Sequence, residues 1–129
     1  MMRLTVPIDP VTKKNSQRIV MVGGRPRVLP SKQFSAYQEA CGPYLREIEG
    51  WDGVPIDYPV NIACVFHRRT RRRCDLTNLL EAIDDILVHY GVLADDNCSI
   101  VAAHDGSRVA YDKDFPRTEI VIERVAQDA

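Results

Sequence analysis

The chain has 129 residues, of which 45% are hydrophobic and 27% charged, and this composition indicates one ordinary globular domain with its own core. No apolar run is long enough to cross a membrane and no signal-peptide pattern opens the sequence, so we expect a cytoplasmic protein with no membrane partner. The net charge is only −1.

That small net charge hides a strong segregation of charged residues along the chain. Residues 1–32 carry seven Lys or Arg against one acid, and residues 68–73 carry five arginines and no acid. Residues 75–96 then carry six acids and no Lys or Arg. The small net charge is therefore the average of strongly polarised segments.

Hydrophobic periodicity and turn residues predict the elements in chain order. A strand over residues 2–8 is followed by a hairpin, 18–22 and 25–29, that turns at Gly23-Gly24. Ser31 is a helix N-cap candidate, and apolar residues recur at helical spacing up to Ile48, with Pro43 expected to kink or interrupt the helix. The remaining predicted elements are a buried strand at 58–66, a helix at about 76–90 ended by Gly91, a short strand at 98–103, a polar connector at 106–116 and a closing strand at 118–125. Together they predict a single α+β domain, a mixed β-sheet flanked by two main helices.

The acidic segment 75–96 overlaps the second predicted helix. Taken singly, each acid has an ordinary explanation: Asp75 as an N-cap, Glu81, Asp84 and Asp85 as a solvated face, and Asp95 and Asp96 as part of a turn. Six acids without a neighbouring cation repel one another, however, and a divalent cation would offset that repulsion. Carboxylates with open water positions suit Mg²⁺, for which Mn²⁺ can substitute.

A basic run stands directly before these acids. It is either a solvated strand edge or a phosphate-binding loop, and the absence of partner acids favours phosphate. Lys13 and Lys14 make a weaker version of the same argument. The predicted DNA-binding residues are Lys13, Lys14, Arg68, Arg69, Arg71, Arg72 and Arg73.

The run from Asp75 to Leu87, followed by Gly91 to Asp96, resembles the central motif of RusA-like Holliday junction resolvases. That family's pattern is Asp-x-Asp-Asn, a lysine three residues on, an aspartate four further, then a glycine and an Asp-Asp pair. Carried over by position, Asp75 and Asp96 match essential metal ligands, and Asn78, Asp85 and Asp95 match the other motif residues. The resemblance implies a homodimer, Mg²⁺ dependence and endonucleolytic cleavage of branched DNA in recombination and repair, commonly in phages and prophages.

Two positions depart from the family pattern. Thr77 stands where the family has its second aspartate, and Glu81 stands where it has the lysine. Because these two residues are one helical turn apart on one face, we interpret Glu81 as the displaced ligand, and the missing positive charge as supplied by Arg71–Arg73 or by Lys13 and Lys14. We therefore predict Asp75, Glu81 and Asp96 as metal ligands and catalytic residues, Asp95 as a further catalytic residue, and Asn78, Asp84 and Asp85 as supporting residues.

Two other classes of function remain as alternatives. The departures at Thr77 and Glu81 would suit a DNA-junction-binding protein that keeps the fold but cuts weakly or not at all. An acidic protein-interaction module would leave the arginine run unexplained.

Overall fold

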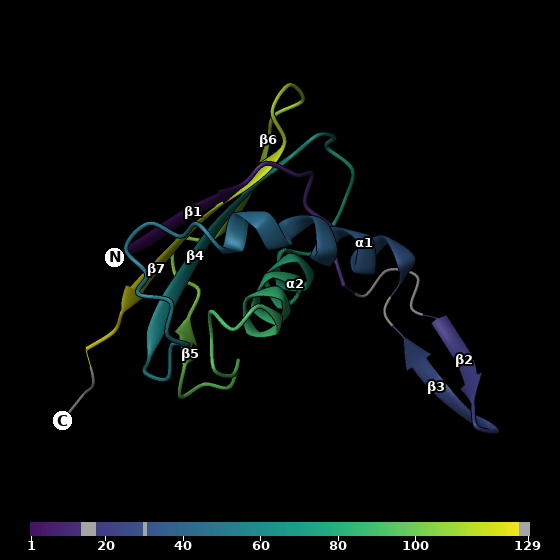
Figure 1. Cartoon of the computed structure of the whole chain (residues 1–129). Coiled ribbons are helices and arrows are strands. Elements are labelled where there is room, and N and C mark those ends of the chain that lie inside the picture. Colours follow the sequence, from purple (N-terminus) through teal and green to yellow (C-terminus); the bar gives the residue numbers. More distant parts are fainter. Residues whose placement is uncertain (14–17, 30, 127–129) are drawn as a thin grey trace.

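A computed structural model describes residues 1–13, 18–29 and 31–126 of the protein (Figure 1). Within these ranges the helical elements are two α-helices and one short 3-10 helix, and the strands form one sheet of five and one hairpin of two. The elements in chain order are β1 (Met2–Val6), β2 (Arg18–Val22), β3 (Arg25–Leu29), α1 (Lys32–Cys41), η1 (Gly42–Leu45), β4 (Val60–Arg68), α2 (Leu76–His89), β5 (Val101–Ala103), β6 (Arg108–Tyr111) and β7 (Arg117–Arg124).

The main sheet has mixed strand directions. Its order is β1-β7-β4-β5, and β6 also pairs with β4. The pairs β1–β7 and β4–β7 are antiparallel, whereas β5 and β6 both run parallel to β4. The predicted class, a single α+β domain with a mixed sheet and two main helices, is therefore confirmed.

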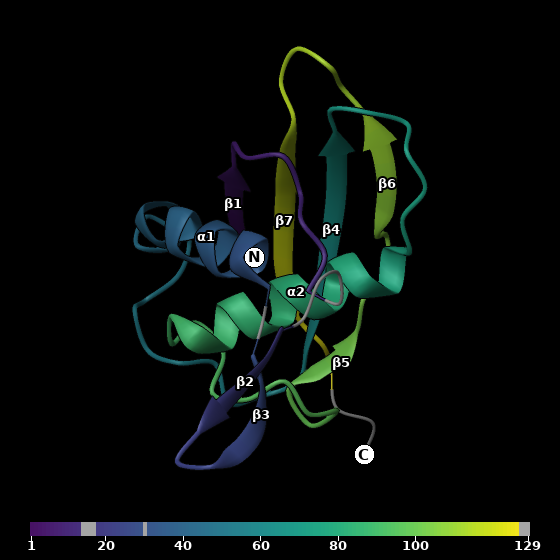
Figure 2. The ribbon, with the colours of Figure 1, turned by 90° about the vertical axis from the view of Figure 1, so that its right-hand side faces the viewer.

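Strict alternation of buried and less buried residues explains why the central strands form. Ile62, Cys64 and Phe66 of β4 are fully buried. They pair in register with Ile122, Ile120 and Thr118 of β7, which are also buried. Because side chains alternate across a strand, this register directs one apolar row of the sheet toward the two helices, which both lie in front of the sheet in Figure 2.

The two helices begin and end close to the positions that the sequence predicts. Ser31 is the N-cap of α1, and its hydroxyl accepts a hydrogen bond from the backbone N–H of Phe34 at 3.0 Å. The α-helical part ends at Cys41, and a 3-10 turn containing Pro43 replaces it, as expected of an interior proline. Gly91 follows α2 with a positive φ of 73°, the conformation that ends helices at glycine. No helix among the described residues is long and apolar enough to span a membrane.

Two local predictions between residues 98 and 116 are wrong in detail. The strand predicted at 98–103 is shortened to β5, because the Asn97 carbonyl and side chain accept hydrogen bonds from Ser99, Ile100 and Val101 and fold the chain into a turn. The predicted polar connector contains β6, which pairs with the end of β4. Periodicity missed β6 because its residues are mostly exposed and so lack an apolar alternation.

The β2–β3 hairpin projects away from the sheet and helices (Figure 1). Its register places Ile19 opposite Val28 and Met21 opposite Pro26. Ile19, Met21 and Val28 are 75%, 67% and 63% exposed. The hairpin therefore carries an uncovered apolar face, whereas the core of the domain lies between the sheet and the helices.

Candidate active site

The arginine segment, residues 68–73, leaves the end of β4 and leads to the start of α2. None of its arginines takes part in an ion pair with a described residue. The segment is held by its backbone instead, because Asp9 Oδ1 accepts a hydrogen bond from the N–H of Arg69 at 3.0 Å. The guanidinium of Arg71 also stacks on the ring of Tyr111 in β6, 4.2 Å from the ring centroid. The positive charges are therefore positioned but not neutralised.

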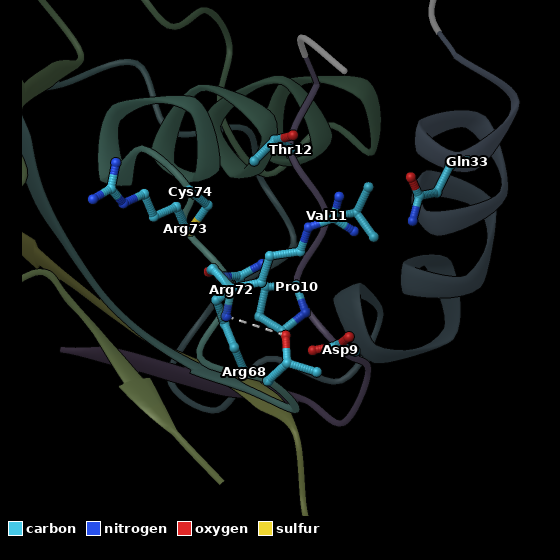
Figure 3. A pocket seen from close by; sticks show the side chains of 10 residues that line it. Asp9, Pro10, Val11, Thr12, Gln33, Arg68, Arg72, Arg73 and Cys74 are labelled. Carbon is cyan, nitrogen blue, oxygen red and sulfur yellow. Dashed lines mark hydrogen bonds between the residues drawn. The ribbon is translucent and has the colours of Figure 1, made fainter. Parts of the chain in front are cut away.

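Part of this segment lines an open hollow of about 590 Å³, which we call the arginine hollow (Figure 3). In Figure 3 the chain from Asp9 to Thr12 runs along it, with Gln33 of α1 on the other side. Its lining residues are Asp9, Pro10, Val11, Thr12, Gln33, Arg68, Thr70, Arg72, Arg73 and Cys74.

Two polar atoms of the arginine hollow are buried without a hydrogen-bond partner among the described residues, Thr12 Oγ1 and Arg68 Nε. Buried polar groups are normally satisfied, and each one left unpaired costs about 1–3 kcal/mol. Thr12 is only 8% exposed. A hydroxyl and a guanidinium N–H that both need an acceptor suit an anionic oxygen such as that of a phosphate.

A second, smaller hollow of about 240 Å³ adjoins the first, and we call it the Asp75 hollow. It is lined by Thr12, Arg73, Cys74, Asp75 and Asn78, so the two hollows share three residues. Asp75 occupies the N-cap position of α2, yet its carboxylate makes no capping hydrogen bond. The carboxylate instead accepts a hydrogen bond from Asn78 Nδ2 at 3.3 Å. The N-cap position predicted for Asp75 is therefore confirmed without the capping bond, and its Oδ1 has no hydrogen-bond partner among the described residues.

The predicted pair after Gly91 lies in an exposed turn in which the two carboxylates differ. Asp95 accepts hydrogen bonds from the backbone N–H of Asp96 at 2.8 Å and from Asn97 Nδ2 at 3.0 Å, and these bonds lower its pKa. The pKa of Asp96 is raised, first by partial desolvation and then by the negative charge of Asp85. Asp96 and Asp85 are thus close enough to repel each other.

Asp84 and Asp85 each contact a cationic or ionisable group that the sequence did not connect to them. Asp85 forms an ion pair with the ammonium of Lys13. Asp84 Oδ2 lies 2.8 Å from Nε2 of His104, and the other ring nitrogen of His104 lies 2.8 Å from the carbonyl oxygen of Ile62. The hydrogen bond to Asp84 is the main cause that raises the pKa of His104. No sequence signal joins these pairs, because their members are far apart in the chain.

The remaining predicted site residues are not gathered into one cluster. Glu81 is exposed on α2 and forms neither a hydrogen bond nor an ion pair with a described residue. Lys14 lies outside the described residues. Within residues 1–13, 18–29 and 31–126, no three His, Cys, Asp or Glu side chains are close enough to hold one metal ion.

Guanidinium groups without an ion-pair partner among the described residues line a hollow that shares residues with a second hollow containing the carboxylate of Asp75, and such an arrangement suits a phosphate backbone. The profile of a protein family described as "Endodeoxyribonuclease RusA" matches residues 7–123, which is most of the chain. The protein therefore belongs to the RusA endodeoxyribonuclease family, whose members are hydrolases that act on branched DNA as junction resolvases. No curated protein matches the chain.

Proposed function

We propose that this protein is a Mg²⁺-dependent endonuclease that cuts branched DNA, Holliday junctions in particular, by hydrolysing phosphodiester bonds during recombination and repair. One observation carries the proposal: the arginine hollow and the Asp75 hollow are neighbours that share Thr12, Arg73 and Cys74 in their linings. Cations that bind a DNA backbone are thereby next to a carboxylate that makes no capping hydrogen bond to the backbone of its helix.

In this proposal the residues that line the two hollows have separate roles. Arg68 and Arg72 donate hydrogen bonds to phosphate oxygens, and Arg69, Arg71 and Arg73 add positive charge along the backbone path. The buried Thr12 hydroxyl donates a hydrogen bond to a phosphate oxygen, which satisfies an atom that otherwise lacks a partner among the described residues. Asn78 holds the carboxylate of Asp75 through its side-chain amide. The phosphodiester is thus oriented before any bond is broken.

The carboxylates suit Mg²⁺ as a cofactor. Mg²⁺ keeps several waters and is commonly bound by only one or two carboxylates, so a cluster of three protein ligands is not required. Asp96, whose pKa the neighbouring Asp85 helps to raise, would be stabilised in its ionised form by a divalent ion. We propose Asp75 and Asp96 as the main ligands and Glu81 as a further carboxylate, with Asp95 and Asp85 adding negative charge. When bound, the ion supplies water activation and charge stabilisation at the phosphate.

The decisive experiment incubates the protein with a synthetic four-way junction and with a linear duplex of the same sequence, each in Mg²⁺ and in EDTA. The expected result is Mg²⁺-dependent nicking of the junction in preference to the duplex. Mg²⁺ should also raise the melting temperature of the protein alone, because a ligand that binds only the folded state stabilises it. Tight junction binding with no nicking under any of these conditions would instead support the non-catalytic DNA-binding alternative.

We further propose that the protein acts as a homodimer, because resolving a four-way junction requires two cuts and one chain carries one such site. The apolar face of the β2–β3 hairpin is the surface we propose for contact with a second copy, since Met21 and Val28 are largely exposed. Met21→Ser with Val28→Ser should then lower the mass measured by light scattering. Val54→Ser, at a residue that is 61% exposed elsewhere, is the control and should leave the mass unchanged.

A further inference from the structure

The acidic segment 75–96 contains no Lys or Arg, so any cation that neutralises it has to come from another part of the chain. Among the described residues, one lysine does so: the ammonium of Lys13 pairs with Asp85, which is 72 residues later. Their side chains are 30% and 25% exposed, so water screens this pair less than it screens a fully exposed one. The ion pair is therefore a built feature of the site and not a contact between two solvated side chains.

Asp85 is the carboxylate at which a positive charge has the widest effect. It lies on the same helix as Glu81, one turn later, and like charges at this spacing repel. Its charge is also felt by Asp96 in the turn after α2. A cation on Asp85 therefore reduces the repulsion among carboxylates of both α2 and the following turn.

Lys13 also fixes the chain segment that lines the arginine hollow and, through Thr12, the Asp75 hollow. Residues 9–13 are attached at one end by Asp9, which accepts the N–H of Arg69, and at the other end by the Lys13–Asp85 pair. Between these attachments lies Thr12, which lines both hollows. Without the second attachment, the wall that carries the Thr12 hydroxyl would lose its ion pair with α2.

We propose that Lys13 is a positioning residue for DNA hydrolysis: it acts through Asp85, by holding segment 9–13 on α2 and offsetting the charge of the acidic segment, and not by binding the DNA backbone. This assignment rests on the proposed endonuclease function. It differs from the phosphate contact that the sequence predicts for Lys13, because the two roles affect different kinetic constants. A phosphate contact contributes to substrate binding, whereas a positioning contact contributes to turnover.

The test compares Lys13→Met, Lys13→Arg, Asp85→Asn and the double variant Lys13→Met with Asp85→Asn on a four-way junction in Mg²⁺. Lys32→Met is the matched control, because Lys32 is exposed at the start of α1 and its loss removes the same charge. We expect Lys13→Met to lower kcat by about 10- to 100-fold, the range typical of residues that hold a metal-site carboxylate, and Lys13→Arg to retain most of it. The kcat of the double variant should be no lower than that of Asp85→Asn, since Lys13 has no role without its partner.

A second measurement needs no cleavage. In EDTA, Lys13→Met should lower the melting temperature by leaving Asp85 unpaired, and adding Asp85→Asn should recover part of that loss, whereas Lys32→Met should change little. If wild type does not cut the junction, the proposed function fails, and this melting cycle still decides whether Lys13 and Asp85 are coupled. If wild type cuts and Lys13→Met raises KM with kcat unchanged, Lys13 is a phosphate contact and the inference is wrong. Additive effects of Lys13→Met and Asp85→Asn on kcat or on melting would overturn it equally.

Discussion

The two sides of α2 use consecutive aspartates for different purposes. Asp84 faces the sheet, where its side chain is 14% exposed and bonded to His104, itself held by the carbonyl of Ile62 on β4. Asp85 faces segment 9–13, where it meets Lys13 beside Asp96. One residue along the helix thus separates a carboxylate tied to the core from one that belongs to an open acidic surface.

This difference shows that residue type and sequence position do not decide the role of an acid on an amphipathic helix. On the sheet side one oxygen of Asp84 is bonded to a partner that is fixed in the fold, while the other is buried without a partner among the described residues, so a change there should act on stability. The open side leaves carboxylates that repel one another and are available to a cation, so a change there should act on turnover. The following experiments test this division, from the largest expected effect to the smallest.

The division predicts the largest effect for the open-side ligands. Asp75→Asn and Asp96→Asn should each lower junction nicking by about a thousandfold, because a metal contributes several kcal/mol of transition-state stabilisation. Junction affinity in EDTA and the unfolding free energy should stay near the wild-type values, since neither carboxylate contacts a cationic side chain of the described chain. Turnover near wild type in either variant would show that the metal assignment is wrong.

A smaller effect is expected where the open side meets the arginine segment. Replacing Arg71 and Arg72 by Ala should weaken binding to every DNA substrate by about 100-fold at low salt, as expected for the loss of one charge-assisted hydrogen bond at Arg72 and one backbone charge at Arg71. The slope of log K against log salt should flatten by about one unit per lost phosphate contact. Arg46→Ala, at an exposed arginine after η1, is the control. An unchanged slope would return these arginines to the solvated-edge interpretation.

On the sheet side, His104→Leu should act on stability and leave nicking by the folded protein intact. At pH 6 we expect it to lower the unfolding free energy by about 2 kcal/mol, because the partly buried Asp84 loses its partner. The folded-state pKa of His104 is raised, so its contribution is complete below about pH 6.5, the unfolded value, and is lost as pH rises through the folded value.

The difference between wild type and His104→Leu should therefore shrink between pH 6 and pH 9, as measured by urea unfolding. His89→Leu is the control, because His89 is exposed at the end of α2, the helix that carries Asp84. A difference that grows with pH would mean that His104 is neutral in its contact with Asp84.

The smallest effect is expected at Glu81. Its side chain forms no hydrogen bond or ion pair with a described residue, so its carboxylate is less well held than that of Asp75. Glu81→Gln should raise the Mg²⁺ concentration for half-maximal nicking by about tenfold while kcat at saturating Mg²⁺ changes little. An unchanged Mg²⁺ requirement would make Glu81 an ordinary solvated residue of α2.

Local patterns were sufficient to predict most elements of this fold. The hairpin, both helices and the three long strands follow from periodicity, from the cap at Ser31 and from the glycines that end elements. The sequence did not predict β6, because its exposed residues gain stability from pairing with β4 and not from an apolar face. The position of Asp75 at the start of α2 was predictable, but its unused carboxylate was not, since a capping bond depends on local side-chain geometry.

The side-chain pairs within the site could not be predicted from the sequence. The sequence offered Lys13 only as one of several sources of positive charge. The structure instead joins Lys13 to Asp85 and His104 to Asp84. Such pairs depend on which loop crosses which helix. That is a property of the folded topology, and a single sequence does not reveal it.

The outer edge of the main sheet has a consequence for solubility. Beyond β4 that edge is divided between β5, with three residues, and β6, with four. At the opposite edge, the backbone of Arg3 in β1 is already bonded to Glu49. Long unpaired strand edges are templates on which other chains add strands and grow into fibrils, and short or covered edges prevent this. The domain can thus accumulate at high concentration with little tendency to aggregate through its main sheet.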